Sequence, residues 1–307
     1  MFNEVSGKVF RNCAFILAVI VLVALSATES RAQARRTGSL RITTGHPGSV
    51  IFINHIRHGV TNDEGVLELP RVQAGSYPIK VRTTGFADYR GSVVIAAGGK
   101  REIKVTHQPT SDQALIGFQK GETLRDSGQN EEAVERYKAA IELRPVFPEA
   151  RVAMTRCLIT MQDYQEAEKQ ILAAIKQYKG PYPEAQTVLA NLRRNQGLTD
   201  ESIVEYRKAL RLARNISPEA HIGLAIALEE QGEMDEAIKE YRVGISQDMD
   251  TESILYYLLG AALEKINRNK EAIAAYRNYL RLDPEGIYAS AVESIIEKLK
   301  EQPDGQM

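Results

Sequence analysis

The carboxy-terminal two thirds of the chain repeats itself every 34 or 35 residues. The repeat is clearest at three positions spaced i, i+4 and i+7, which fall on one face of a helix. The first position is small in all five copies: Ala133, Ala167, Ser202, Ala237 and Ala272. The second is mostly aromatic and the third mostly small: Tyr137, Ile171, Tyr206, Tyr241 and Tyr276, then Ala140, Ala174, Ala209, Gly244 and Tyr279. A unit that recurs at this period predicts a stack of helical hairpins, in which each copy buries its apolar face against the next.

A second, earlier helix is predicted in each copy. Twelve residues before each first position stands another small or short residue: Gly121, Thr155, Ala190, Ala225 and Gly260. Small groups at both places allow two antiparallel helices to approach closely. The tripeptide Pro-Glu-Ala at 148, 183 and 218 suits a first helical turn. Gly128, Gly197, Gly232 and Asn267 suit a left-handed cap at the end of the first helix, and Gln162 is the exception.

These residues resemble the tetratricopeptide repeat, with five copies beginning near 114, 148, 183, 218 and 253 within residues 112–304. Pro145 and Pro284 match the family's closing proline, and a helix-A leucine recurs as Leu189, Leu224 and Leu259. Lys120 replaces that leucine in the first copy, so we expect this copy to pack differently, against the preceding domain. Residues 287–301 are expected to form a helix that caps the last repeat, as solenoids need.

The resemblance implies a concave groove lined by the first helix of each copy, chiefly by its fifth and ninth residues. The candidate partner-binding residues are Phe118, Val152, Arg156, Thr187, Asn191, Ile222 and Tyr257. This set is apolar with a polar centre at Arg156, Thr187 and Asn191. It suits a peptide that presents apolar side chains and one acidic or amide group. The alternative is that some of these side chains only pack between repeats.

Residues 38–107 predict a small antiparallel β-sandwich. Apolar residues alternate in short runs, as in Leu40 and Ile42 or Ile79 and Val81, and turn formers separate the runs. The segment His46-Pro47-Gly48-Ser49 followed by residues 50–54 resembles the PEGA domain, with the carboxypeptidase-regulatory-like sandwich as the alternative. Either resemblance implies a non-catalytic binding or spacer module.

The first 34 residues have the pattern of an export signal. Lys8 and Arg11 precede an uncharged run over 12–28, and Ala32-Gln33-Ala34 fits a cleavage site. A run of 17 residues is slightly short for a membrane span, so cleavage after Ala34 is favoured over an uncleaved anchor. Either outcome places the rest of the chain outside the cytoplasm, in the periplasm, the cell envelope or the extracellular space.

Composition excludes several classes of function. Lys and Arg number 39 against 40 Asp and Glu, so the chain lacks the basic excess of a nucleic-acid binder.

The candidate metal ligands are His46, His55 and His58 with Asp63 and Glu64. Polar turn residues are the favoured interpretation of this group, and we expect no metal and no cofactor. Cys157 stands at a position in the first helix of its repeat where a small, buried side chain is expected, so we expect its thiol to have a structural role. Neither a nucleophile motif nor a phosphate-binding glycine loop is found, so we expect no enzyme.

Charge is divided between the two modules. Residues 38–107 carry nine Lys and Arg against five Asp and Glu, and residues 108–307 carry 25 against 33. The net charges of +4 and −8 are compatible with docking between them, but solvated faces are the commoner explanation. The sequence as a whole predicts an exported adaptor that binds protein or peptide segments of envelope proteins in the groove of its solenoid. The alternative is a surface protein whose β domain binds a wall polymer or glycan, with the repeats as a stalk.

Overall fold

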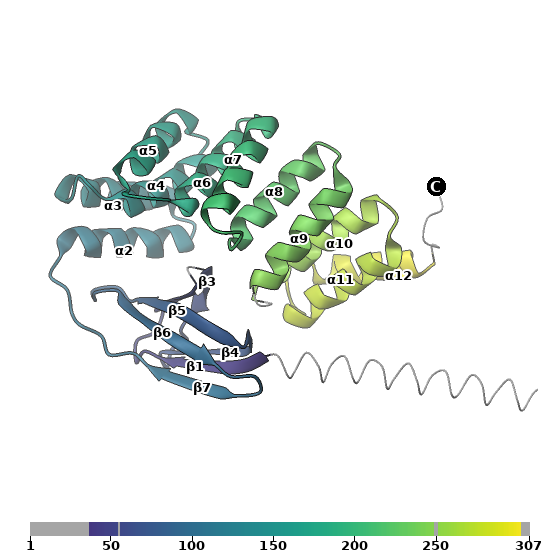
Figure 1. Cartoon of the computed structure of the whole chain (residues 1–307), viewed down its shortest axis with the longest axis horizontal. Helices are drawn as coiled ribbons and strands as arrows, with labels where there is room; N and C mark the ends of the chain where they lie inside the picture. Colours follow the sequence, from purple (N-terminus) through teal and green to yellow (C-terminus); the bar gives the residue numbers. More distant parts are fainter. Residues whose placement is uncertain (1–36, 55, 249–250, 302–307) are drawn as a thin grey trace, which may run out of the picture.

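The computed structural model describes residues 37–54, 56–248 and 251–301. A β domain comes first and an arched array of helices follows it (Figure 1). The predicted export signal, residues 1–34, lies outside the described residues. Within the described ranges, no helix combines the length and the apolar character that a membrane crossing requires.

The β domain consists of two small sheets packed face to face. One sheet has the order β4-β1-β7, formed by Val66–Gln73, Thr37–Thr43 and Lys100–Lys104. The other has the order β3-β2-β5-β6, formed by Ile56–Val60, Val50–Ile53, Gly75–Arg82 and Tyr89–Ile95. The alternating apolar residues fill the space between them, since Leu40, Ile42, Ile51, Ile53 and Val81 are at most 1% exposed. The predicted sandwich is confirmed.

One strand pair runs parallel in this otherwise antiparallel domain. β6 belongs to the second sheet, and the turn at Ala96–Gly99 carries the chain across to the free edge of β1 in the first sheet. β7 therefore runs in the same direction as β1, with Ile42 opposite Ile103. The sequence predicted the strands but not this crossover, because alternation identifies the buried face of a strand and not its neighbour.

In the described part of the remaining chain, the helices form five pairs and a capping helix, as the sequence predicted. The pairs are α2 (Gln113–Asp126) with α3 (Asn130–Leu143), α4 (Pro148–Thr160) with α5 (Tyr164–Gln177), α6 (Pro183–Asn195) with α7 (Thr199–Leu212), α8 (Pro218–Glu230) with α9 (Met234–Asp248), and α10 (Ser253–Lys265) with α11 (Asn269–Leu282). Helix α12 (Ala289–Lys300) covers the last pair, and its Val292, Ile296 and Leu299 are buried in the core of the final repeats. Ile287, where the sequence placed the start of this helix, precedes it and is 90% exposed.

The repeated small and aromatic residues hold each pair together. All five residues of the first repeated position are fully buried, and so are the four tyrosines of the second position, at 0–1% exposure. A Cβ atom on Gly121 would lie 2.6 Å from the ring of Tyr137, and one on Gly260 would lie 2.7 Å from the ring of Tyr276. The glycines are therefore required because the tyrosine ring of the second helix lies against the backbone of the first.

Every first helix ends in a left-handed residue, including the one where the sequence lacks glycine or asparagine. The φ angles are 77° at Gly128, 78° at Gly197, 86° at Gly232 and 56° at Asn267. Gln162, the predicted exception, adopts the same conformation with φ 61°. The geometry of the turn is thus imposed by the packing of the repeat, and repeat 2 accepts the strain of a side chain there.

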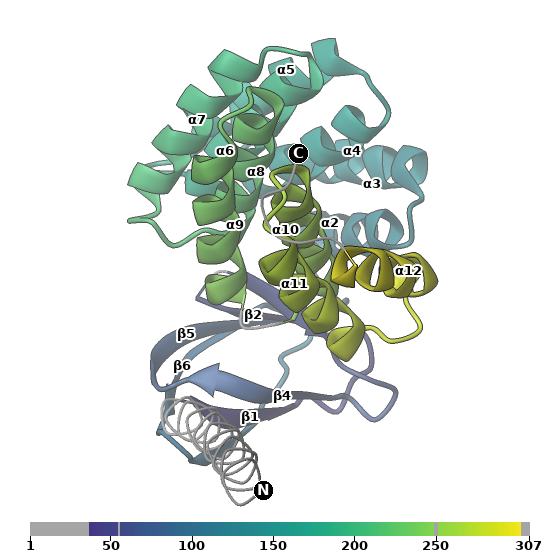
Figure 2. The same ribbon diagram turned by 90° about the vertical axis from the view of Figure 1, so that its right-hand side faces the viewer.

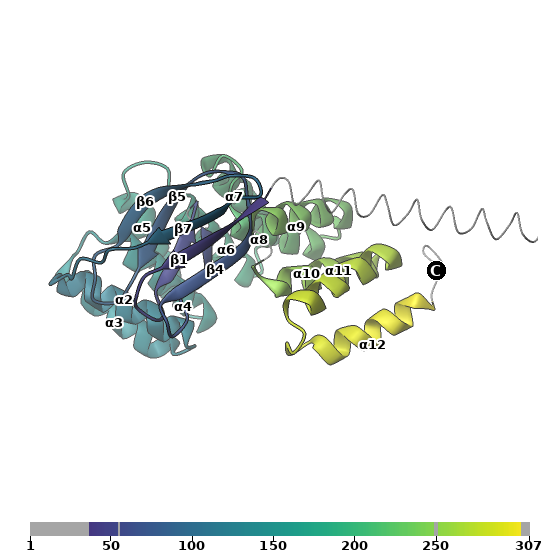
Figure 3. The ribbon, with the colours of Figure 1, turned by 90° about the horizontal axis from the view of Figure 1, so that it is seen from below.

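The helix pairs step around an arc, and the β domain lies on its inner side. Figure 2 shows the stack of pairs above the sandwich. Figure 3, seen from below, shows the sandwich in front of the earlier helices, with α10, α11 and α12 extending beyond it. The first helices α2, α4, α6 and α8 adjoin one another in sequence order. With α10, the first helix of the last pair, they form the inner, concave wall of the solenoid.

Candidate functional site

The seven predicted groove residues fall into two groups. Phe118, Val152 and Thr187 are buried, at 1–3% exposure. Phe118 packs with Tyr137 and Phe147, at ring-centroid distances of 5.9 and 5.2 Å, and the Thr187 hydroxyl donates to the carbonyl of Pro183. The other four, Arg156, Asn191, Ile222 and Tyr257, are half-buried. The surface accessible to a partner therefore includes the second group.

Arg156 is the centre of a charged network that crosses three first helices. Its guanidinium on α4 donates two hydrogen bonds to the carboxylate of Glu219 on α8, one of them at 2.9 Å, and lies 3.6 Å from the carboxylate of Glu184 on α6. The Asn191 amide donates to the same Glu219 carboxylate at 3.1 Å. The acidic group that the sequence assigned to a ligand is thus supplied by the chain itself.

The electrostatics of this network favour its charged form. Burial alone would raise the pKa of Glu219. The positive charge of Arg156 and the hydrogen bonds from Arg156 and Asn191 outweigh this effect and hold the pKa below its usual value. Burial would likewise lower the pKa of Arg156, and the Glu219 carboxylate raises it instead. Both groups remain ionised around neutral pH, so an incoming acidic group has to displace Glu219.

The repeated tyrosines donate hydrogen bonds to the first helices, and the acceptor stands at one of two positions in the repeat. Tyr137 donates to Glu122, and Tyr206 to Asn191, each a ninth residue of its repeat. Repeats 4 and 5 have Ile226 and Ala261 at that position. There the acceptor shifts by three residues, so that Tyr241 donates to Glu229 and Tyr276 to Glu264, both at 2.9 Å.

This shift leaves an apolar strip at the distal end of the concave wall. We call Ile222, Ile226, Tyr257 and Ala261 the distal strip; all four are half-buried. Ile222 and Ile226 lie three and seven residues after Glu219 and so share its face of α8. Tyr257 stacks on Tyr288, with ring centroids 4.5 Å apart and an angle of 13° between the planes. The strip thus combines aliphatic side chains with an aromatic end.

The opposite end of the wall is occupied by the β domain. Arg82, at the end of β5, donates to the Glu122 carboxylate at 3.1 Å, and its guanidinium lies 4.6 Å from the ring centroid of Phe118. The Gln119 amide accepts from the backbone N–H of Gly85 and donates to the carbonyl of Phe86, both at 2.9 Å. The first repeat does pack against the β domain, as its departure from the pattern predicted.

Four residues of this site were not predicted from the sequence, because the repeat pattern either gave them another role or did not include them. Glu184 and Glu219 belong to Pro-Glu-Ala tripeptides, which account for a helix start without any further role. Gln119 and Arg82 carry no repeat signature at all. The only available signals were the opposite net charges of the two modules and the departure at Lys120.

The histidines do not assemble a metal site in the part of the chain that is described. His55 lies outside that part, and no group of three or more metal-ligating side chains occurs within it. Burial lowers the pKa of His58 to about 4, so this side chain is neutral at physiological pH. His46 and His107 instead pack on Phe86, with ring centroids 4.6 and 5.1 Å from it. Cys157 is fully buried, and burial raises the pKa of its thiol to about 11, in keeping with a structural role.

Two modules, a β-sandwich and a helical-repeat solenoid with a partly apolar concave wall, define the architecture of a protein-binding scaffold. Residues 37–111 match the PEGA domain family, and three tetratricopeptide-repeat families match residues 124–192, 187–250 and 254–285. The chain is a tetratricopeptide-repeat protein with an amino-terminal PEGA domain.

Solved structures support the solenoid fold. The tetratricopeptide-repeat protein TTC0263 of Thermus thermophilus aligns with a TM-score of 0.52 and 16% identity, covering 62% of this chain and 100% of that one. The pilF protein of Pseudomonas aeruginosa aligns at 0.53 and 13%, covering 62% and 85%. A chain of the APC/C hetero-tetramer Cut9–Hcn1 aligns at 0.54 and 13%, covering 61% of this chain and only 36% of that one. No curated protein sequence matches the chain.

Proposed function

We propose that this protein is an exported, non-catalytic adaptor that binds a segment of another protein along the concave wall of its solenoid. The observation that carries the proposal is the distal strip, where Ile222, Ile226 and Tyr257 remain half-buried on a wall whose other end is filled by the β domain. Half-exposed apolar side chains beside a fixed polar network suit an extended or helical segment that inserts apolar residues. We place the contact on repeats 3 to 5.

The non-catalytic part of the proposal rests on how the polar groups of the wall are used. Arg156, Glu219 and Asn191 bind one another, and Glu229 and Glu264 accept from buried tyrosines. These groups position the helices and neutralise one another. They need no cofactor for that role.

Export is supported by the first 34 residues and by the kind of domain that follows them. Two basic residues, the uncharged run over 12–28 and the Ala32-Gln33-Ala34 site form a signal pattern. PEGA domains are associated with extracellular or periplasmic proteins. The proposed partners are therefore segments of envelope proteins, and an uncleaved signal would tether the adaptor to the membrane.

Binding of a wall polymer by the β domain is the weaker proposal. The aromatic residues that a glycan would use there are Tyr77, Phe86 and Tyr89. Phe86 packs on His46 and His107, and Tyr77 donates its hydroxyl to the carbonyl of Gln73. Tyr77 and Tyr89 also pack against the core of the sandwich. These contacts engage the rings within the domain, so we place binding on the solenoid.

Site-specific photo-crosslinking in the intact envelope of the source organism tests the proposal. A photoreactive phenylalanine analogue replaces Tyr257 in the distal strip or, as the matched control, Val204 on α7, which is 60% exposed. We expect a discrete protein adduct from position 257 that Ile226→Asp abolishes. Equal adducts from both positions, or none from 257, would contradict the proposal.

A further inference from the structure

The β domain meets the solenoid mainly through polar side chains. Arg82 and Glu122 are 10% and 14% exposed at their side chains, and Arg57 pairs with Asp126 at 3.1 Å. Gln119 adds two hydrogen bonds to the backbone of the β5–β6 loop. Among the described residues, these two ion pairs, the Gln119 amide and the Arg82 guanidinium on the Phe118 ring connect the domain to α2.

No apolar core joins the two modules within the described residues. Across residues 37–54, 56–248 and 251–301, the buried apolar side chains form three clusters, one inside the sandwich and two inside the solenoid, and none contains residues of both modules. Salt screens the more exposed pair Arg57–Asp126, so its contribution to this interface weakens with ionic strength. Relative motion of domains is the general expectation for such interfaces.

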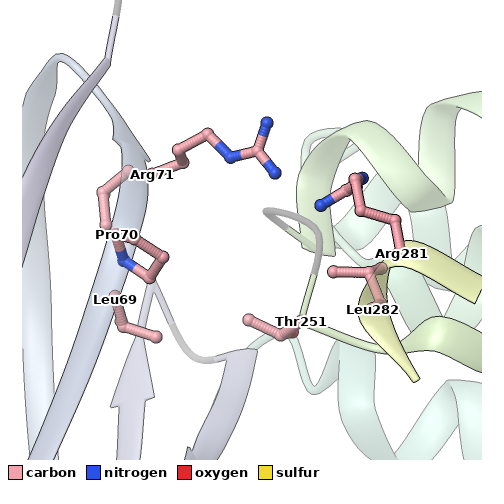
Figure 4. A pocket seen from close by; sticks show the side chains of 7 residues that line it. Leu69, Pro70, Arg71, Thr251, Arg281 and Leu282 are labelled. Atoms are coloured by element: carbon pink, nitrogen blue, oxygen red, sulfur yellow. The ribbon is translucent and has the colours of Figure 1, made fainter. Parts of the chain in front are cut away.

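The docked domain spans the mouth of the concave wall. At one end, Arg82 lies on Phe118 and Glu122, the fifth and ninth residues of repeat 1 and hence members of the groove pattern. Along the wall, the Lys80 ammonium, which lies 4.0 Å above the Phe52 ring, interacts electrostatically with Glu184 on α6. At the far end, Leu69–Val72 of β4 faces Thr251 and Leu282 of the last repeat across a cavity of about 130 Å³ (Figure 4).

The connection between the modules offers one pivot. The linker stays with the β domain as far as Thr110, whose N–H donates to the carbonyl of Gly85 at 3.0 Å. Helix α2 is already capped by Asp112, whose carboxylate accepts from the N–H of Leu115. Only Ser111, which is exposed, lies between the two attachments.

We propose that the β domain is a reversible, intramolecular occupant of the solenoid's concave wall, seated by Arg82 on repeat 1 and released by rotation about Ser111. The docked form covers the wall at repeat 1 and extends across its mouth to Thr251 and Leu282, and the released form opens it. A partner that uses the whole wall therefore competes with the chain's own β domain. This inference concerns the chain alone and stands whether or not the distal strip binds a partner.

Small-angle X-ray scattering of the full chain tests the docking. Asp126→Lys places a like charge against Arg57 without altering the β domain, and Arg82→Glu removes the central pair. We expect each to increase the radius of gyration and to accelerate proteolysis at residues 110–112 on the order of tenfold. Adding Arg57→Asp to the Asp126→Lys chain restores an ion pair and should return both readouts toward the wild-type values.

Two charge reversals serve as controls. Glu135→Lys changes an exposed residue of α3, and Arg41→Glu changes an exposed residue of β1 that pairs within its own domain. Both should leave the radius of gyration and the cleavage rate unchanged. The proposal is overturned if Asp126→Lys leaves both readouts at the wild-type values, or if its effect equals that of Glu135→Lys.

Discussion

Arg156 on α4 and Glu219 on α8 form a two-point ion pair that passes across the intervening first helix α6. The two residues are 63 positions apart in sequence. Only the rise of the solenoid from one repeat to the next brings them together. The pair links repeat 2 directly to repeat 4 and helps to fix the curvature of the concave wall.

We expect a double-mutant cycle with Arg156→Gln and Glu219→Gln to give a coupling energy of about 1 kcal/mol, because the pair is bidentate and the Arg156 side chain is only 26% exposed. The coupling should fall as salt is raised. The matched pair Glu135–Lys138, exposed on one helix, should couple by only about 0.3 kcal/mol. Equal couplings for the two pairs, measured by denaturant unfolding, would show that the Arg156 pair has no special role.

Two glycines one turn apart on α2 should respond oppositely to alanine. A Cβ at Gly121 would lie 2.6 Å from the Tyr137 ring, whereas one at Gly117 would make its nearest contact at an ordinary 3.6 Å. Gly121→Ala should therefore lower the free energy of unfolding by about 1–3 kcal/mol through overpacking. Gly117→Ala should raise it by up to about 1 kcal/mol, because alanine favours the helix. Circular dichroism during denaturant unfolding measures both, and a stabilising Gly121→Ala would refute the packing account.

Glycine at position 162 should stabilise the protein. Gln162 holds φ at 61°, a conformation that strains a side chain and that glycine adopts freely. We expect Gln162→Gly to raise the free energy of unfolding by about 0.5–1 kcal/mol, the strain relief exceeding the added flexibility of the unfolded chain. The neighbouring Met161 ends α4 in a right-handed conformation, so Met161→Gly should be destabilising. Thermal unfolding distinguishes the two, and a lower midpoint for Gln162→Gly contradicts the prediction.

Asp248 should make stability depend on pH between about 4 and 6. Burial raises the pKa of its carboxyl to about 6, although Thr251 and the N–H of Glu252 donate hydrogen bonds to it. A carboxyl whose pKa is higher in the folded state favours folding at low pH, and this contribution is lost as pH rises through 6.

Asp248→Asn removes the charge and keeps an oxygen acceptor. It should raise the free energy of unfolding by on the order of 2 kcal/mol at pH above about 7 and change it little near pH 4. Asp235→Asn on the same helix, where the side chain is 83% exposed, is the control and should have little effect at either pH. A destabilising Asp248→Asn at neutral pH would show that the carboxylate is favourable there.

The sequence predicted the contacts that recur with the helix period. Ala133 and Tyr137 lie on one face, and the same spacing returns in each copy, so the five pairs and their small-residue contacts follow from one pattern. The left-handed cap was also predicted at four of five repeats. Gln162 was not, because a neighbouring unit can impose a backbone conformation that the local residue disfavours.

Contacts between distant segments could not be predicted in the same way. Glu219 has a sufficient local explanation at a helix start, and its pairing with Arg156 depends on superhelical geometry that no single repeat encodes. The contact of Arg82 with Phe118 and Glu122 depends on how two separately folded modules pack together. The opposite net charges are compatible with docking, but charge totals do not identify the residues that touch.

Hydrogen–deuterium exchange of the full chain, with and without the protein captured from position 257, locates the binding surface on the solenoid. We expect the partner to slow exchange in α8 and α10, which carry the distal strip, and to leave the outer helices α5 and α7 unchanged. Protection confined to the outer helices or to the β domain, with α8 and α10 unaffected, would contradict it.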